Sequence, residues 1–85
     1  MKVVKVLFFA GLREAVGTGA EDVVLPEGVR TVGALRDHLA GRGGAWQALA
    51  AMRNLRAAVN QGMARLDGTV KDGDEVAFFP PVTGG

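Results

Sequence analysis

The chain has 85 residues, a length that allows one small domain with a single core. Hydrophobic residues make up 48% of it, and 10 lysines and arginines nearly balance 9 aspartates and glutamates, for a net charge of +1. This charge balance argues against nucleic acid or an anionic membrane surface as the main partner. No apolar run approaches the ~20 residues that span a bilayer, and the lack of cysteine excludes disulfides and thiolate chemistry.

The first predicted element is a strand over residues 2–10, which is rich in Val and Phe. Side chains alternate along a strand, so one face is uniformly apolar and should meet the core. That face is made of Val4, Val6 and Phe8. The opposite face carries Lys5 but also presents Leu7 and Phe9. A short helical turn over residues 11–16 is expected next.

A second strand over residues 21–25 is expected to pair with the first strand as a wide hairpin. A helix should follow from Val32 to about Arg42, with Thr31 as its N-cap. The spacing of three apolar residues predicts the buried stripe of this helix. They are Val32, Leu35 and Leu39. A second short helix over residues 45–52 carries Trp46, which we expect to cover the core as a half-buried side chain.

Three more strands are predicted, over residues 55–60, 63–66 and 76–79, the first two joined as a hairpin. The first and last strands are the most apolar in the chain, and the most apolar strands belong at the centre of a sheet. A strand-helix-strand crossover favours their parallel pairing. One main helix on one face of a mixed sheet is an α+β, two-layer arrangement.

The side chains offer no recognisable catalytic set. The chain has no serine and one histidine, His38, for which we expect a structural role. The acidic stretch over residues 72–75 lacks the further ligands and spacing of a calcium loop, so we expect a solvated turn there and no metal site. Without cysteine, any sulfur that this protein handles must be carried by something other than a side-chain thiol.

The end of the chain has a distinct composition. Pro80 and Pro81 should end the last strand, because neither can donate a ladder hydrogen bond. The tail that follows is Val82, Thr83, Gly84 and Gly85. Its glycines lack Cβ atoms and can approach another surface closely, and the stretch from Pro81 onward can reach at most roughly 17 Å. We therefore expect a folded domain over residues 1–81 and a flexible tail over residues 82–85.

Residues 72–85 read Asp-Gly-Asp-Glu-Val-Ala-Phe-Phe-Pro-Pro-Val-Thr-Gly-Gly. Along its whole length this stretch resembles the terminal signature of the molybdopterin synthase small-subunit family, the ubiquitin-like sulfur carriers of molybdenum cofactor biosynthesis. Residues 5–10 and 57–61 also match the family. The resemblance implies the β-grasp, or ubiquitin-like, fold, a mixed sheet of about five strands with one main helix on one face.

The same resemblance implies a function in which the chain is not an enzyme by itself and binds no cofactor. An activating enzyme uses ATP to adenylate the carboxylate of Gly85, and a sulfur donor displaces AMP to leave a C-terminal thiocarboxylate. The large, catalytic subunit then takes up the tail in a heterotetramer. There the thiocarboxylate donates sulfur to cyclic pyranopterin monophosphate, forming the dithiolene of molybdopterin.

The expected partner interface follows from the strand faces. If the two terminal strands pair, Leu7, Phe9 and Phe79 form an exposed apolar patch beside Pro80 and Pro81, unless the short helices cover it. No nucleic acid or membrane partner is expected, and without a signal peptide in the first residues we expect a cytoplasmic protein.

Three alternatives stay open on the sequence alone. The first is a thiazole-pathway sulfur carrier with the same fold and the same Gly-Gly end, although the Phe-Phe-Pro-Pro-Val-Thr run favours the molybdenum pathway. The second is a ubiquitin-like protein modifier joined to lysines through Gly85. The third is an interaction module whose tail is inert.

Overall fold

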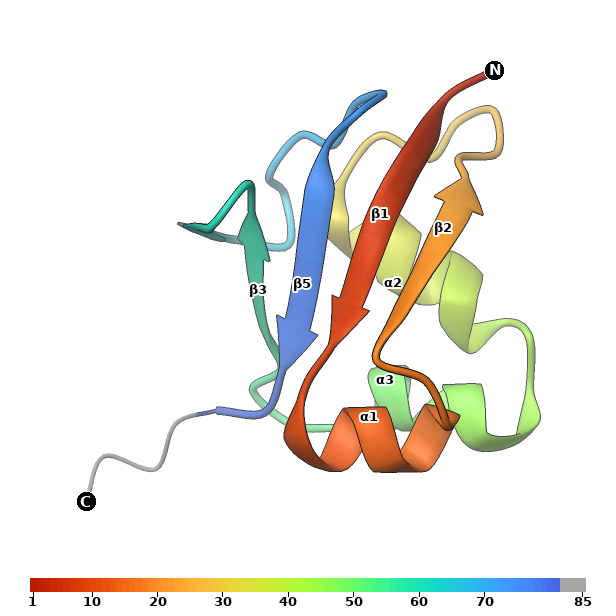
Figure 1. The fold of residues 1–85 in the computed structure, drawn as a ribbon, viewed down its shortest axis with the longest axis vertical. Coiled ribbons are helices and arrows are strands. Elements are labelled where there is room, and N and C mark those ends of the chain that lie inside the picture. Colours follow the sequence, from red (N-terminus) through yellow and green to blue (C-terminus); the bar gives the residue numbers. More distant parts are fainter. Residues whose placement is uncertain (82–85) are drawn as a thin grey trace.

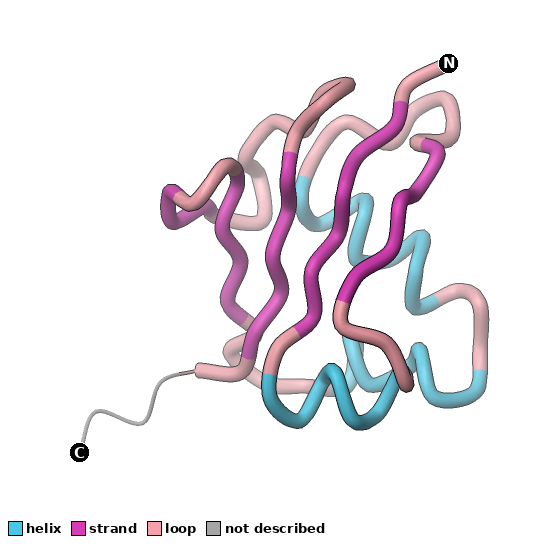
Figure 2. Tube along the Cα trace, viewed as in Figure 1, coloured by secondary structure: helices cyan, strands magenta, loops and turns pink. Residues whose placement is uncertain are grey.

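The computed structural model describes residues 1–81, so the predicted tail over residues 82–85 lies outside the described residues. The elements in chain order are β1 (Val3–Phe8), α1 (Ala10–Val16), β2 (Ala20–Val24), α2 (Val32–Ala40), the 3₁₀ helix η1 (Gly44–Gln47), α3 (Ala48–Ala51), β3 (Arg56–Val59), β4 (Gly62–Ala64) and β5 (Glu75–Phe79). Figure 1 shows the sheet as one layer with α2 behind it, and α1 at the end of the sheet where the described chain leaves β5. Figure 2 shows the same separation of strands from helices.

The five strands form one mixed sheet in the order β2-β1-β5-β3-β4. Strands β1 and β5 pair in parallel, and the other neighbours pair antiparallel. The parallel register places Val6 beside Val76 and Phe8 beside Phe78. The predicted mixed sheet of about five strands is therefore confirmed, with the two most apolar strands adjacent and inside it.

The core lies between the sheet and α2. The predicted core face of β1 is confirmed, since each of its three side chains is at most 1% exposed, and the predicted stripe of α2 is fully buried. Burying one such Val, Leu or Phe side chain contributes about 1.5–3 kcal/mol. The N-cap prediction is also confirmed, because the hydroxyl oxygen of Thr31 accepts a hydrogen bond from the Ala34 N–H at 3.1 Å.

Helix α2 ends at Ala40, two residues before the predicted end. The Arg42 and Gly43 amides donate to carbonyls three residues earlier, those of Leu39 and Ala40, at 3.1 Å each. These are turn bonds, and Gly43 then adopts a φ of +80°, which stops the helix.

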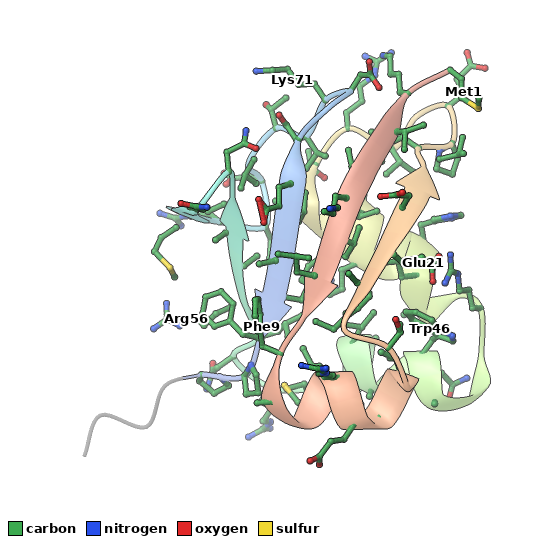
Figure 3. The ribbon with its side chains drawn as sticks, in the orientation of Figure 1. Met1, Phe9, Glu21, Trp46, Arg56 and Lys71 are labelled. Atoms are coloured by element: carbon green, nitrogen blue, oxygen red, sulfur yellow. The ribbon has the colours of Figure 1, made fainter. Side chains whose placement is uncertain are left out.

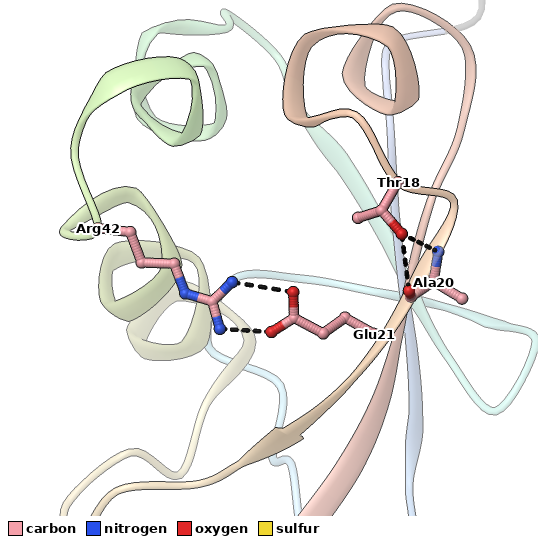
Figure 4. Close-up of polar contacts among 4 residues, drawn as sticks. All are labelled: Thr18, Ala20, Glu21 and Arg42. Carbon is pink, nitrogen blue, oxygen red and sulfur yellow. Dashed lines mark hydrogen bonds and ion pairs between the residues drawn. The ribbon is translucent and has the colours of Figure 1, made fainter.

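Trp46 is half-buried, as predicted, and covers one end of the core. Its ring meets the Phe8 ring edge-on with 5.4 Å between centroids, and the Arg42 guanidinium lies 4.5 Å from the Trp46 ring centroid. Figure 4 shows Arg42 making two hydrogen bonds, of 3.0 and 2.5 Å, to the Glu21 carboxylate on β2. These bonds hold the pKa of Glu21 below its usual value and raise the pKa of Arg42. Both side chains are about one-third exposed, so the pair adds less than about 1 kcal/mol.

The β3–β4 hairpin is shorter than predicted, and its turn is made by Asn60 and Gln61, both with positive φ. Strand β4 ends at Ala64 because the chain then turns to the N-terminus of α2. There the Leu66 carbonyl accepts from the Gly33 N–H at 2.8 Å, and the Gly68 carbonyl accepts from the Val32 N–H at 2.9 Å. No helix within residues 1–81 is long and apolar enough to cross a membrane.

Candidate functional site

The exit of β5 is held from both sides of the strand. Phe78 pairs with Phe8 on β1 and with Ala57 on β3, and its carbonyl accepts a hydrogen bond from the Phe9 N–H at 3.2 Å. Pro80 and Pro81 follow directly and end the ladder. The structure therefore fixes the point from which the remaining residues depart. The predicted working residues Val82, Thr83, Gly84 and Gly85 lie outside the described residues.

A shallow apolar groove lies on the face of the sheet opposite α2. It brings together the predicted Leu7, Phe9 and Phe79 in a hollow of about 290 Å³. Phe9 is 47% exposed, while Leu7 and Phe79 are half-buried. Figure 3 shows Phe9 at the end of the sheet where the described chain leaves β5, so the short helices leave this side chain uncovered.

The predicted prolines lie beside this groove and not in it. Pro80 and Pro81 are half-buried, and Pro81 lines a neighbouring hollow formed by β3, the end of β4 and their loops. The groove also contains Ala58 and Gln61, which sequence reasoning missed. Alternation along β3 could have placed Ala58 on this face, but only with the knowledge that β3 is the neighbour of β5.

The start of β5 is tied down by the acidic stretch that precedes it. The expectation of a solvated turn is wrong for Asp74, which is 6% exposed. Its carboxylate accepts from the Asn60 side-chain amide at 3.0 Å and from the Lys71 N–H at 2.9 Å. Asp72 accepts from the Val3 N–H at 2.7 Å, which joins this stretch to β1. The stretch is therefore a structural clasp between β1, β5 and the β3–β4 turn.

The charge of Asp74 is stabilised within this clasp. Burial alone raises the pKa of Asp74, but the hydrogen bonds from the Lys71 N–H and the Asn60 amide, with the nearby Lys71 charge, outweigh it and hold that pKa below its usual value. Asp74 is therefore an ionised structural residue at neutral pH, with both carboxylate oxygens already occupied.

No group of three or more potential metal ligands occurs among the residues that the structure describes. His38 is exposed on α2, away from the buried stripe of that helix. The geometry up to Pro81 thus supports the docking of another protein on the groove, and the described side chains form no constellation for acid–base or nucleophilic catalysis.

Known proteins resemble this chain over nearly its whole length. The model of the ThiS family matches residues 6–85. The molybdopterin synthase sulfur carrier subunit of Escherichia coli strain K12 is 51% identical over 83 residues, which cover 98% of this chain and all of that protein.

Two solved structures share the fold over nearly the whole chain. One is a putative molybdopterin converting factor subunit 1 from Pyrococcus furiosus, with a TM-score of 0.80 and 32% identity, covering 96% of this chain and all of that one. The other is small archaeal modifier protein 1 of H. volcanii, with a TM-score of 0.77 and 30% identity over the same shares. These likenesses confirm the predicted β-grasp fold.

Proposed function

This chain belongs to the ThiS family, and on that premise we propose that it is the sulfur carrier subunit of a molybdopterin synthase. The observation that supports this most is the 51% identity to the Escherichia coli subunit of that name, which extends over nearly the whole of both chains. The family match also runs through to Gly85, so it includes the residues that the function requires.

The working group in this proposal is the carboxylate of Gly85. A carboxylate is a poor electrophile, so an activating enzyme first uses ATP to convert it to an acyl adenylate. A sulfur donor then displaces AMP and leaves a thiocarboxylate. The chain contains no cysteine, so no side-chain thiol competes with this terminal group as the sulfur carrier. The folded body contributes a fixed point of departure, because β5 is paired with β1 up to Phe78 and with β3 up to Phe79.

The proposed partner is the large subunit of molybdopterin synthase, in a heterotetramer. The groove of Leu7, Phe9 and Phe79 supports this, because an exposed apolar patch on a small protein usually marks an interface. Docking there brings the residues after Pro81 to the partner's surface. Within the large subunit the thiocarboxylate donates its sulfur to cyclic pyranopterin monophosphate, and the partner's closed site limits hydrolysis of this group. The residues of the reaction site belong to the partner, so the chain is not an enzyme by itself.

Intact-mass measurement of the protein purified from cells tests the proposal. The expected result is a species heavier by the difference between one sulfur and one oxygen atom, located on the last residue by fragmentation. The matched control is Gly85→Ala, which we expect to lack that species and to support no sulfur transfer. Normal conversion of the pterin precursor by Gly85→Ala, or a wild-type protein that never gains sulfur, would refute the proposal.

A ubiquitin-like protein modifier is the second candidate, and the likeness to small archaeal modifier protein 1 favours it. In that case Gly85 forms an amide bond with lysine side chains of other proteins. The same mass measurement separates the two candidates, because digestion of cellular protein would yield lysines that carry the C-terminal residues of this chain. A carrier gives the sulfur-containing species in free protein and no such adducts.

A further inference from the structure

A second surface feature adjoins the groove at the exit of β5. It is an open hollow of about 600 Å³ between β3, the end of β4 and the start of the tail. Its lining residues are Asn54, Leu55, Arg56, Arg65, Leu66 and Pro81. The two charged side chains in it are both arginines, and both are exposed. The hollow is therefore a locally basic surface directly beside the last described residue.

The β3–β4 hairpin brings these two arginines to one hollow. Ala57 pairs with Ala64, and Arg56 and Arg65 are the adjoining residues of the two segments, where both line the hollow. Like charges that share one hollow repel each other. The ion pairs found within residues 1–81 are Arg36–Asp37 and Arg42–Glu21, so neither Arg56 nor Arg65 has a carboxylate within 4.0 Å there.

The basic hollow is continuous with the apolar groove. Arg56 is the register partner of Phe79, and it lies two residues from Ala58 on β3, hence on the same face of the sheet. Both Phe79 and Ala58 line the groove. Figure 3 draws Arg56 and Phe9 at the same end of the sheet. A protein that covers the groove must therefore also cover or adjoin Arg56, and a covered guanidinium without a counter-charge is costly.

We propose that the protein which receives the tail presents carboxylates to Arg56 and Arg65, immediately beside the apolar side chains that it places on the groove. This inference rests on the proposed function, whose large subunit is the partner to test first. An arginine fork can bind a carboxylate through two parallel hydrogen bonds, which fixes orientation as well as charge. Opposite charges at the rim of an interface also raise the association rate.

The opposite end of β1 supplies a matched control. A hollow of about 370 Å³ there is lined by Lys2 and Arg30, again two basic residues, but Glu27 lines it too. This control hollow lies beside the N-terminal end of β1, whereas the groove and Arg56 adjoin the exit of β5. Reversing both basic charges in either hollow changes the net charge of the protein by the same amount. A difference in association rate between the two double variants therefore depends on where the charges lie and not on the net charge of the protein.

The experiment measures association of the full chain with its cognate large subunit at low and high salt. For Arg56→Glu/Arg65→Glu we expect an association rate at least about tenfold below wild type at low salt, with the gap closing at ~0.5 M salt. For Lys2→Glu/Arg30→Glu we expect a rate within about twofold of wild type. The inference is overturned if both double variants associate equally slowly, or if Arg56→Glu/Arg65→Glu associates as fast as wild type. In either case, binding of the wild-type protein to the large subunit leaves the proposed function intact. A wild-type protein that does not bind the large subunit overturns both.

A stability measurement guards against a variant that simply misfolds. Arg65→Glu alone replaces one of the two like charges in the hollow by a carboxylate, so the Tm of the free protein should stay within about 2 °C of wild type or rise, while association with the large subunit slows. A fall in Tm together with slower association would attribute the slowing to misfolding and would overturn the inference. Faster association of this variant would show that the receiving surface is not acidic, and would overturn the inference.

Discussion

Phe8 and Phe9 are neighbours in the sequence, but their side chains lie on opposite faces of the sheet. Phe8 is 1% exposed in the core, whereas Phe9 is 47% exposed in the groove. Truncation to alanine should therefore give opposite results. Phe8→Ala leaves a cavity among Trp46 and Phe78, which ring contacts place next to it, and should cost about 3–5 kcal/mol. For a domain of this size, that loss lowers the Tm by roughly 15–30 °C.

Phe9→Ala should leave the fold nearly unchanged and weaken docking. About half of its surface is already in water, and its N–H still donates to the Phe78 carbonyl in the variant, so the stability loss should stay below about 1 kcal/mol. An aromatic side chain at the centre of an interface typically costs about 2 kcal/mol or more on truncation, which raises Kd by about 30-fold. Thermal unfolding by circular dichroism measures the first quantity, and calorimetric titration with the large subunit measures the second.

Val24→Ala is the matched control for Phe9→Ala. Val24 has a similar exposed fraction, 51%, but it lies on β2 opposite Val3, at the far end of β1 from the groove. It should change neither Tm nor Kd appreciably. The reasoning is refuted if Phe9→Ala binds within about twofold of wild type, or if it is destabilised as much as Phe8→Ala.

Three further predictions concern the support of the site and its working end. Asp74→Asn should cost about 2 kcal/mol at neutral pH, because the new amide must turn an NH₂ group toward a hydrogen-bond donor. Since the folded-state pKa of Asp74 is lowered, its contribution is present above about pH 4 and is lost as pH falls through the folded value, so urea unfolding of wild type and variant should converge in acid. Gly33→Val should lower the Tm, because a Cβ there meets the Leu66 carbonyl oxygen at 3.1 Å, whereas Gly11→Ala, with open space around it, should raise the Tm slightly. Gly85→Ala should abolish sulfur transfer in a reconstituted assay without changing the Tm, since a methyl group added at the last residue alters none of the core contacts described within residues 1–81.

Much of the fold could be predicted because alternation and helical spacing are local properties. The period of two in β1 identified its buried face, and the 3-and-4 spacing in α2 identified its stripe, without knowledge of what each face would meet. The first strand, the last strand and their shared exposed face then located Leu7, Phe9 and Phe79. Register between strands far apart in the sequence is not a local property, so the place of Ala58 in the groove could not be predicted.

The role of Asp74 was missed for the same reason. A carboxylate in an Asp-Gly-Asp turn has the same local sequence whether it is solvated or buried. Its burial depends on Asn60, 14 residues away, whose side chain donates to Asp74 and accepts from the Glu75 N–H at 3.0 Å each. The two arginines are a further case, since Arg56 and Arg65 line one hollow only because the β3–β4 hairpin folds their segments together. Charge patterning along the chain shows these residues as ordinary dispersed surface.

The two ends of β5 differ in how well their side chains are satisfied within the chain. At its start, Asp72 and Asp74 accept hydrogen bonds from other segments, and no buried side-chain polar atom within residues 1–81 lacks a partner. At its exit, an exposed aromatic ring adjoins a hollow lined by two arginines, and neither arginine has an ion pair within the described part of the chain. Exposed aromatic side chains and neighbouring like charges lower the stability of a free protein, and such features are expected at functional sites. The hydrogen-bonded start of β5 fixes the position of its exit, and the proposed partner would supply at that exit the apolar contacts and opposite charges that the described chain lacks.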